Sequence, residues 1–172
     1  MTQTTKQADA ADLAPIEDRL VDFDGFLERL AAEYGMATLD VVNRLPAEHL
    51  VIVSGDKLPA VLEDVSKWGP ILFIVETDEI VTGMTAELPA AYQADGYFLF
   101  LSPKGFGGHL KEDACVHIGF IHRPFQKRQS RSLHFYNASG EPIFKLFVAR
   151  SGDGDMDPGQ VQAFEDLQAR LS

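Results

Sequence analysis

The hydrophobic period of this chain changes near Trp68, and that change limits the folds it can adopt. Upstream, five apolar residues share one face of a helical repeat: Leu20, Phe23, Leu27, Leu30 and Tyr34. Downstream, apolar residues alternate with polar ones, or form short continuous runs, as strands do. We therefore expect helices first and a sheet afterwards.

The first part of the chain carries the signals of several helices. Gly35 is placed to end the first one. Thr38 can cap a short helix over 39–45, which stops before Pro46. A further helix is expected over 57–67, and a C-terminal helix over 157–171 begins with Asp157 as its cap.

The second part contains seven candidate strands. They cover 71–75, 79–86, 96–101, 108–111, 115–122, 131–137 and 142–149. The segment 137-NASG-140 joins two alternating runs and predicts a hairpin. Because no helical crossovers separate these strands, they predict an antiparallel sheet, and the fold class is α+β.

The chain has 172 residues, which suits one domain with a substantial core. We expect a disordered tail over 1–13 and a single domain over 14–172. Within it, the helical part covers 14–67, the sheet 70–150 and the last helix 157–171. No apolar run is long enough to span a bilayer, and the polar first residues predict a floppy tail rather than a signal peptide.

Charge and cysteine content narrow the function. The formal net charge is −11, which argues against broad binding to nucleic acid, because that affinity comes from neutralising phosphates. The segment 30–45 has a helix-turn-helix pattern, but only Asn43 and Arg44 on its second helix suit DNA, so a packed helical hairpin is favoured. The lone Cys115 has apolar neighbours and is interpreted as a buried thiol in a reducing compartment.

The stretch 104-KGFGGHL-110 places three glycines around His109. Glycine has no Cβ and lets a large flat group approach the backbone, so the imidazole could face a ligand. An ordinary tight turn before a strand explains the same glycines. The residues alone leave both readings open. The sequence contains no HxH, HExxH or CxxC spacing, so a zinc site has no support.

One basic cluster stands out in this acidic chain. Lys127, Arg128 and Arg131 lie in 126-QKRQSR-131, shortly after Arg123. Such cations could pair with carboxylates or phosphates of a ligand, because charge-assisted hydrogen bonds are the stronger ones. A solvated hairpin loop is the alternative.

Several segments of the chain form a longer pattern: 40-DVVNRLP-46, 54-SGDK-57, 68-WG-69, 96-GYF-98, 107-GGHLKEDACVHIGFIHRPF-125 and 131-RSLHFYNASGEPIFKLFVAR-150. In their order and spacing, these segments resemble the cytosolic heme-utilisation carriers of the HutX/ChuX/HugX group. The resemblance covers nearly the whole chain after residue 20.

This resemblance implies a large curved antiparallel sheet like one half of the HemS and ChuS heme proteins, and a homodimer. It also implies a non-enzymatic, cytoplasmic carrier that binds heme as cargo and passes it to a degrading enzyme or other acceptor. His109 falls on a family position where an imidazole is implicated in heme binding, so it is the candidate axial ligand to iron. Arg123, Lys127, Arg128 and Arg131 are candidate partners of the propionates, and Tyr97 is a candidate ring contact. No nucleic-acid or membrane partner is expected.

The chain departs from the family pattern at Glu76. Counting from 68-WG-69, the family members have a second heme-linked histidine there, and a carboxylate is a poorer axial ligand than imidazole. Two alternatives to a carrier therefore stay open. One is a heme-degrading enzyme with a single proximal histidine, and the other is a diverged member that binds another planar or anionic metabolite.

Overall fold

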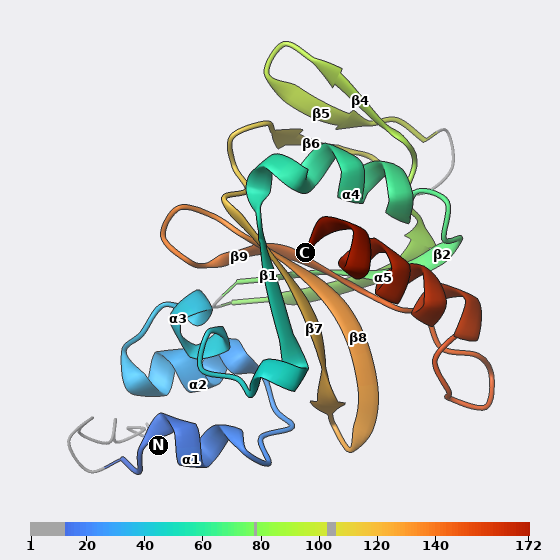
Figure 1. Ribbon diagram of the computed structural model, residues 1–172. Coiled ribbons are helices and arrows are strands. Elements are labelled where there is room, and N and C mark those ends of the chain that lie inside the picture. Colours follow the sequence, from blue (N-terminus) through green and yellow to red (C-terminus); the bar gives the residue numbers. More distant parts are fainter. Residues whose placement is uncertain (1–12, 78, 103–105) are drawn as a thin grey trace, which may run out of the picture.

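The computed structural model describes residues 13–77, 79–102 and 106–172 (Figure 1). Nearly all of the tail expected over 1–13, as well as Gly105, lies outside these residues. No helix within the described ranges is long and apolar enough to cross a membrane.

The larger sheet has six antiparallel strands in the order β1–β7–β8–β9–β2–β3. Their bounds are β1 Leu50–Ser54, β2 Pro70–Glu76, β3 Val81–Glu87, β7 His117–Phe125, β8 Arg128–Tyr136 and β9 Pro142–Phe147. The expected antiparallel sheet is thus confirmed, but it is divided. A smaller sheet contains β4 Ala91–Ala94, β5 Tyr97–Phe100 and β6 Gly108–Lys111 in that order.

The helices lie on the two faces of the larger sheet. Their bounds are α1 Ile16–Leu20, α2 Leu27–Tyr34, α3 Thr38–Val42, α4 Leu58–Val65 and α5 Pro158–Leu171, with short 3-10 turns η2 Ala47–His49 and η3 Gly55–Lys57. Figure 1 shows α1, α2 and α3 grouped together, away from α4, α5 and the smaller sheet. The α+β class with N-terminal and C-terminal helices is confirmed.

Strand alternation builds two different faces from the same strands. Phe120, Leu133 and Phe135 point to one face, where α4, α5 and the smaller sheet cover them in the main core. Ile121 and Tyr136 point to the other face and pack under α1, α2 and α3. The first face is sealed by apolar side chains, whereas the second carries polar groups among its buried residues.

Two sequence expectations hold at the level of single hydrogen bonds. Asp157 caps α5, since its Oδ1 accepts a hydrogen bond from the Gln160 backbone N–H at 2.9 Å. Asn137 organises the β8–β9 hairpin, where its Oδ1 accepts from the N–H groups of Ser139 and Glu141 at 2.9 and 3.0 Å. Cys115 is buried as expected, and burial raises the pKa of its thiol to about 11.

The helix predicted through 20–34 is wrong, because the chain breaks between Leu20 and Leu27. Gly25 lies in this break, and glycine is a poor helix former. The guanidinium of Arg123 stabilises the non-helical backbone of this break, because it donates hydrogen bonds to the carbonyls of Phe23 and Gly25. A residue of the distant strand β7 therefore contributes to this break, which the spacing of apolar residues in the sequence could not predict.

Other local expectations also fail. Strand β1 lies inside the segment expected to be helical, and β4 was not expected. Thr38 is not the cap of α3, since Ala37 has that place and the Thr38 hydroxyl donates to Glu141 at 2.7 Å. The basic loop shrinks to Gln126 and Lys127, both with positive φ, because β8 begins at Arg128. Tight pairing with β7 extends the strand through the charged residues.

Candidate functional site: a groove on the larger sheet

Two adjoining cavities of about 220 and 460 Å³ form one groove on the face of the larger sheet that α2 partly covers. Ile74, Phe125 and Phe147 line both cavities, and Leu72 lines the larger one. The strand register sets these side chains on one face, since Phe147 pairs with both Leu72 and Ser132. We call this feature, with its apolar floor, the sheet groove.

The roof of the sheet groove is the start of α2 and the segment before it. Phe26, Leu27 and Glu28 line the groove from above. The Arg123 guanidinium ties this roof to β7, because it donates to the carbonyls of Phe23, Gly25 and Pro124. Burial lowers the pKa of Arg123, and the nearby carboxylates Glu28 and Asp24 oppose that shift. Arg123 therefore lies in the groove wall with its donors directed to backbone oxygens.

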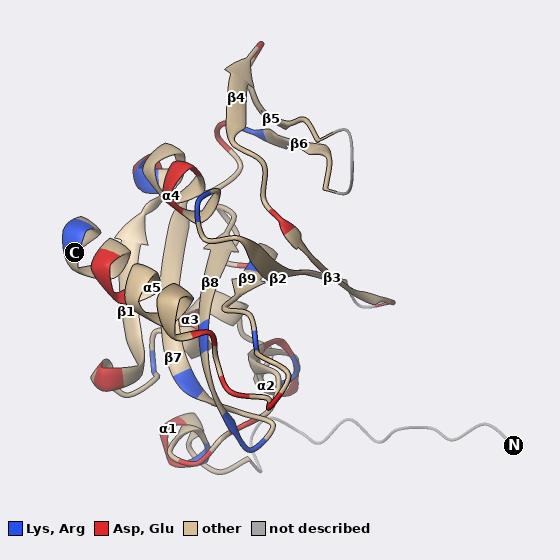
Figure 2. Ribbon diagram, turned by 90° about the vertical axis from the view of Figure 1, so that its right-hand side faces the viewer, with Lys and Arg blue, Asp and Glu red and all other residues tan. Residues whose placement is uncertain are grey.

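One end of the sheet groove is basic. Arg128 and Arg150 line it there, and Lys127 lies next to it at the turn between β7 and β8. Figure 2 shows the blue segments of Lys and Arg near this end of β7 and β8. Arg150 donates to the carbonyls of Gly154 and Gln129. Among the described residues, no carboxylate lies within 4.0 Å of the cationic nitrogens of Arg128 or Arg150.

The floor also contains a buried imidazole. His134 lines the groove with Ser132, and its Nε2 lies 3.1 Å from the Ser132 hydroxyl. Its Nδ1 lies 3.3 Å from the Tyr136 hydroxyl. Burial, followed by the charges of Lys145 and Arg123, holds the pKa of His134 well below its usual 6.5. His134 is therefore neutral at pH 7, with both ring nitrogens engaged in hydrogen bonds.

Three charged side chains meet at the opposite end of the sheet groove: Glu28 and Lys145 line the groove, and Glu76 lines a neighbouring cavity beyond them. Lys145 Nζ lies 2.6 Å from Glu28 Oε1 and 2.7 Å from Glu76 Oε2. The three side chains are only 4, 16 and 11% exposed, in the order Lys145, Glu28, Glu76. We call this group the ion triad. It joins α2, β9 and β2, and its formal charge is −1.

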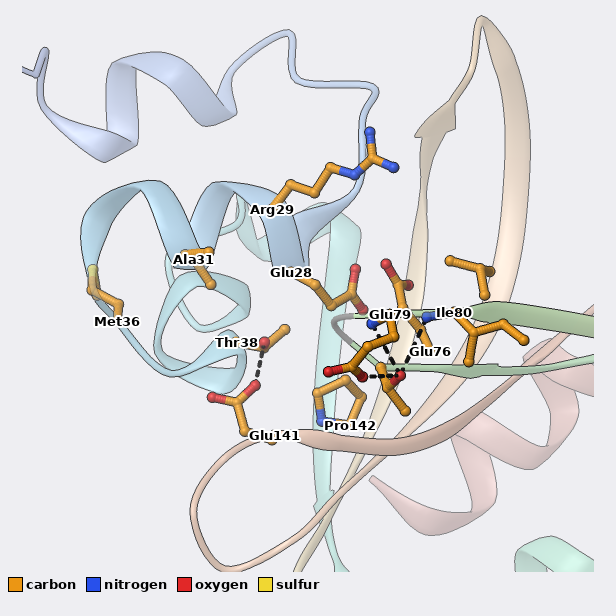
Figure 3. A pocket seen from close by; sticks show the side chains of 13 residues that line it. Glu28, Arg29, Ala31, Met36, Thr38, Glu76, Glu79, Ile80, Glu141 and Pro142 are labelled. Carbon is orange, nitrogen blue, oxygen red and sulfur yellow. Dashed lines mark hydrogen bonds between the residues drawn. The ribbon is translucent and has the colours of Figure 1, made fainter. Parts of the chain in front are cut away.

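A second cavity of about 760 Å³ lies on the far side of the ion triad. Glu28 and Glu76 line it together with Glu79 and Glu141, and among the described residues Arg29 is the one cation in its lining (Figure 3). Figure 3 shows Arg29 pointing away from Glu28 and Glu76. This acidic cavity is larger than the groove, but its charge would repel an anionic ligand.

The structure brings some of the sequence-predicted residues to the groove and places others elsewhere. Arg123, Lys127 and Arg128 lie in or beside it, and Glu76 belongs to the ion triad. Arg131 points to the opposite face of the sheet, where it pairs with Glu165 of α5 at 3.3 Å. Two residues of a strand share a face when their numbers differ by an even amount, and the numbers of Arg128 and Arg131 differ by three.

His109 and Tyr97 lie in the smaller sheet and are not among the residues that line the groove. Their ring centroids are 6.4 Å apart, and both side chains are exposed on the outer face of that sheet. A Cβ added at Gly108 would meet nothing within 4 Å, and Gly108 does not have the positive φ that favours glycine. Neither crowding nor backbone conformation within this chain demands a glycine beside His109.

Sequence reasoning missed Lys145, Arg150, Glu28 and Phe147. Lys145 had a visible signal, because a lysine in the apolar strand 142-PIFKLFVA-149 needs a partner if it is buried. Its partners are 117 and 69 positions away in the sequence, so no local pattern identifies them.

The fold and the groove together define a class of protein: an α+β protein that encloses a ligand-sized groove between a large antiparallel sheet and a short N-terminal helix. A profile of the haem utilisation ChuX/HutX family matches residues 51–167. The chain therefore belongs to the haem utilisation ChuX/HutX family.

Individual relatives agree with this assignment. The intracellular heme transport protein HutX of Vibrio cholerae is 29% identical over 140 residues, which cover 81% of this chain and 72% of that protein. A solved structure of the heme binding protein ChuX is 33% identical, with a TM-score of 0.84, over 91% of this chain and 99% of that one.

A third likeness concerns the fold alone. The heme degrading enzyme ChuS of Escherichia coli O157:H7 is 18% identical with a TM-score of 0.73. The match covers 95% of this chain but 48% of that one, so this chain has the fold of about half of ChuS.

Proposed function

We propose that this chain binds heme in the sheet groove and carries it inside the cell to an acceptor. The observation that supports this most is a ligand-sized groove with an apolar floor and one basic end, in a chain of the ChuX/HutX family. Flat apolar ligands favour such floors, and heme adds two carboxylates that need cations. The relatives HutX and ChuX are described by their names as heme transport and heme binding proteins.

The groove residues have separate roles in this proposal. Leu72, Ile74 and Phe147 contact the porphyrin face, and Arg128 and Arg150 meet the propionates. Lys127, exposed at the turn, adds positive charge at the same end. Arg123 acts indirectly by holding the roof segment on β7. Arg131 has no part, because it lies on the opposite face.

Iron coordination by His109 requires a second copy of the chain. Among the described residues that line the sheet groove, His134 is the sole imidazole, and hydrogen bonds engage both of its nitrogens. His109 is exposed on the smaller sheet near Tyr97 and Tyr92, whose side chains are 38 and 63% exposed. We propose a homodimer in which the smaller sheet of one copy brings His109 to the groove of the other. The fold match to about half of ChuS supports two such units acting together.

A hemin titration followed by Soret absorbance tests the carrier function. We expect saturable binding near one heme per chain, weakened by Phe147→Ala and changed in spectral form by His109→Ala. Incubation with a reductant and oxygen separates a carrier from an enzyme, and we expect the heme spectrum to persist. Release of a heme breakdown product would instead establish the enzyme.

Mixed dimers test the source of His109. One parent carries His109→Ala, and the other carries Arg128→Gln with Phe147→Ala. If His109 acts across the dimer, each mixed dimer regains one intact site, and the histidine-type spectrum returns. If His109 acted within its own chain, every site in the mixture would remain damaged, and no such spectrum would return.

A further inference from the structure

The two ends of the sheet groove carry opposite charge. Arg128, Arg150 and Lys127 lie at one end. At the other end, Glu28 and Lys145 of the ion triad line the groove, and Glu76 pairs with Lys145 from the neighbouring acidic cavity. On β8, six residues separate Arg128 from His134, which pairs with Lys145. At the rise of a strand, this places the two ends about 20 Å apart.

The acidic end disfavours a ligand carboxylate by electrostatic repulsion. The ion triad is buried and has a formal charge of −1, because one lysine faces two glutamates. Glu79 and Glu141 add negative charge in the cavity behind it, whereas Arg29 there points away from the triad (Figure 3). Like charges act strongly where water is excluded, so a carboxylate placed at this end is repelled.

The basic end accepts carboxylates. Among the described residues, Arg128 and Arg150 have no ion-pair partner. Two acids of the adjoining loops make local hydrogen bonds: Asp24 Oδ2 accepts from the Lys127 backbone N–H, and Asp153 Oδ1 accepts from Ser151 and from the Asp155 N–H. A ligand carboxylate can therefore pair with Arg128, while Arg150, whose guanidinium donates to backbone carbonyls, adds positive charge beside it.

From this polarity we infer that the sheet groove selects planar macrocycles whose carboxylates all lie along one edge, and that Glu76 is the residue that sets this selectivity. Heme and protoporphyrin IX have that distribution, and they enter with the carboxylates toward Arg128. A tetracarboxylate such as coproporphyrin III has carboxylates around the ring and must place some of them against the ion triad. The inference rests on the proposed function, and it assigns Glu76 to exclusion instead of iron coordination.

Metal-free porphyrins test the inference without any contribution from an iron ligand. The fluorescence of protoporphyrin IX and of coproporphyrin III is titrated with the native chain and with Glu76→Gln. The native chain is expected to prefer protoporphyrin IX by about tenfold or more, since the juxtaposition of like charges disfavours the tetracarboxylate. Glu76→Gln leaves Lys145 paired with Glu28 in a neutral group, and the preference is expected to shrink several-fold through tighter coproporphyrin III binding.

Glu79→Gln is the matched control, because it removes the same charge from the acidic cavity without touching the ion triad. Thermal unfolding establishes that each variant is folded at the temperature of the titration. Equal affinity of the native chain for the two porphyrins would overturn the selectivity and leave the carrier in place. If Glu76→Gln and Glu79→Gln changed the preference for protoporphyrin IX equally, Glu76 would not be the residue that sets the selectivity. Binding of neither porphyrin would overturn the selectivity, and it would overturn the carrier as well only if the hemin titration also showed no binding.

Discussion

The two faces of the larger sheet are built from the same strands and differ in almost every other respect. Under α4 and α5, the side chains of Phe120, Leu133 and Phe135 form a closed apolar layer. On the other face, Ser132, His134 and Lys145 are equally buried but polar. A one-residue offset along β8 separates these two environments.

This contrast indicates that the apolar face mainly stabilises the fold and that the polar face contains the candidate functional site. Apolar burial contributes roughly 25 cal/mol per Å², so the closed face stabilises the sheet without needing specific partners. Buried polar groups stabilise only when each has its partner, and they specify geometry. The sheet groove lies on this second face, next to the ion triad and above His134.

The largest expected effect is a loss of stability in Phe135→Ala, which is compared with Phe147→Ala on the other face. Phe135 is fully buried and stacks on Phe144, with ring centroids 4.2 Å apart. Phe135→Ala should lower the free energy of unfolding by about 3–5 kcal/mol through loss of contacts and a cavity. Phe147→Ala, at the partly exposed groove floor, should cost about 1–2 kcal/mol but weaken heme binding. Urea unfolding followed by the lone Trp68 measures both, and equal losses would contradict the division between the faces.

The ion triad provides the next test. Lys145→Met leaves Glu28 and Glu76 facing each other without a cation, and should destabilise the chain by about 3 kcal/mol. Replacing all three residues, as Glu28→Gln, Lys145→Met and Glu76→Gln, should recover much of that loss, because no buried charge remains unpaired. If the triple variant were no more stable than Lys145→Met, the unpaired buried carboxylates would not be the cause of the loss.

His134 makes the polar face sensitive to pH. Its pKa in the folded chain is well below 6.5, whereas in the unfolded chain it returns near that value. Below about pH 6.5 the unfolded state therefore binds a proton that the folded state does not, so stability falls as pH falls. The slope is about 1.4 kcal/mol per pH unit until the folded pKa is reached.

His134→Gln should flatten this slope between pH 7 and pH 5.5 in urea unfolding. Burial also lowers the pKa of His122, so part of the slope should survive in His134→Gln. An unchanged slope in that variant would mean that His134 is not the group responsible.

The sequence predicted the α+β class, the β8–β9 hairpin and the cap of α5, because periodicity and capping are local signals. It did not predict the break before α2, which depends on Arg123 from a strand 98 positions away. The sheet groove was beyond reach for the same reason. Phe147, Leu72 and Ser132 meet through strand pairing, and the basic cluster could not reveal that Arg128 and Arg131 face opposite ways.

That last pair supplies the most direct test of the account. Arg128→Gln and Arg131→Gln remove the same charge from one strand, three residues apart, on opposite faces. In hemin titrations followed by Soret absorbance at low and high salt, Arg128→Gln should weaken binding by about tenfold at low salt, with less effect at high salt. Arg131→Gln should bind as the native chain does. Equal weakening by both variants, or by Arg131→Gln alone, would contradict the placement of heme in the sheet groove.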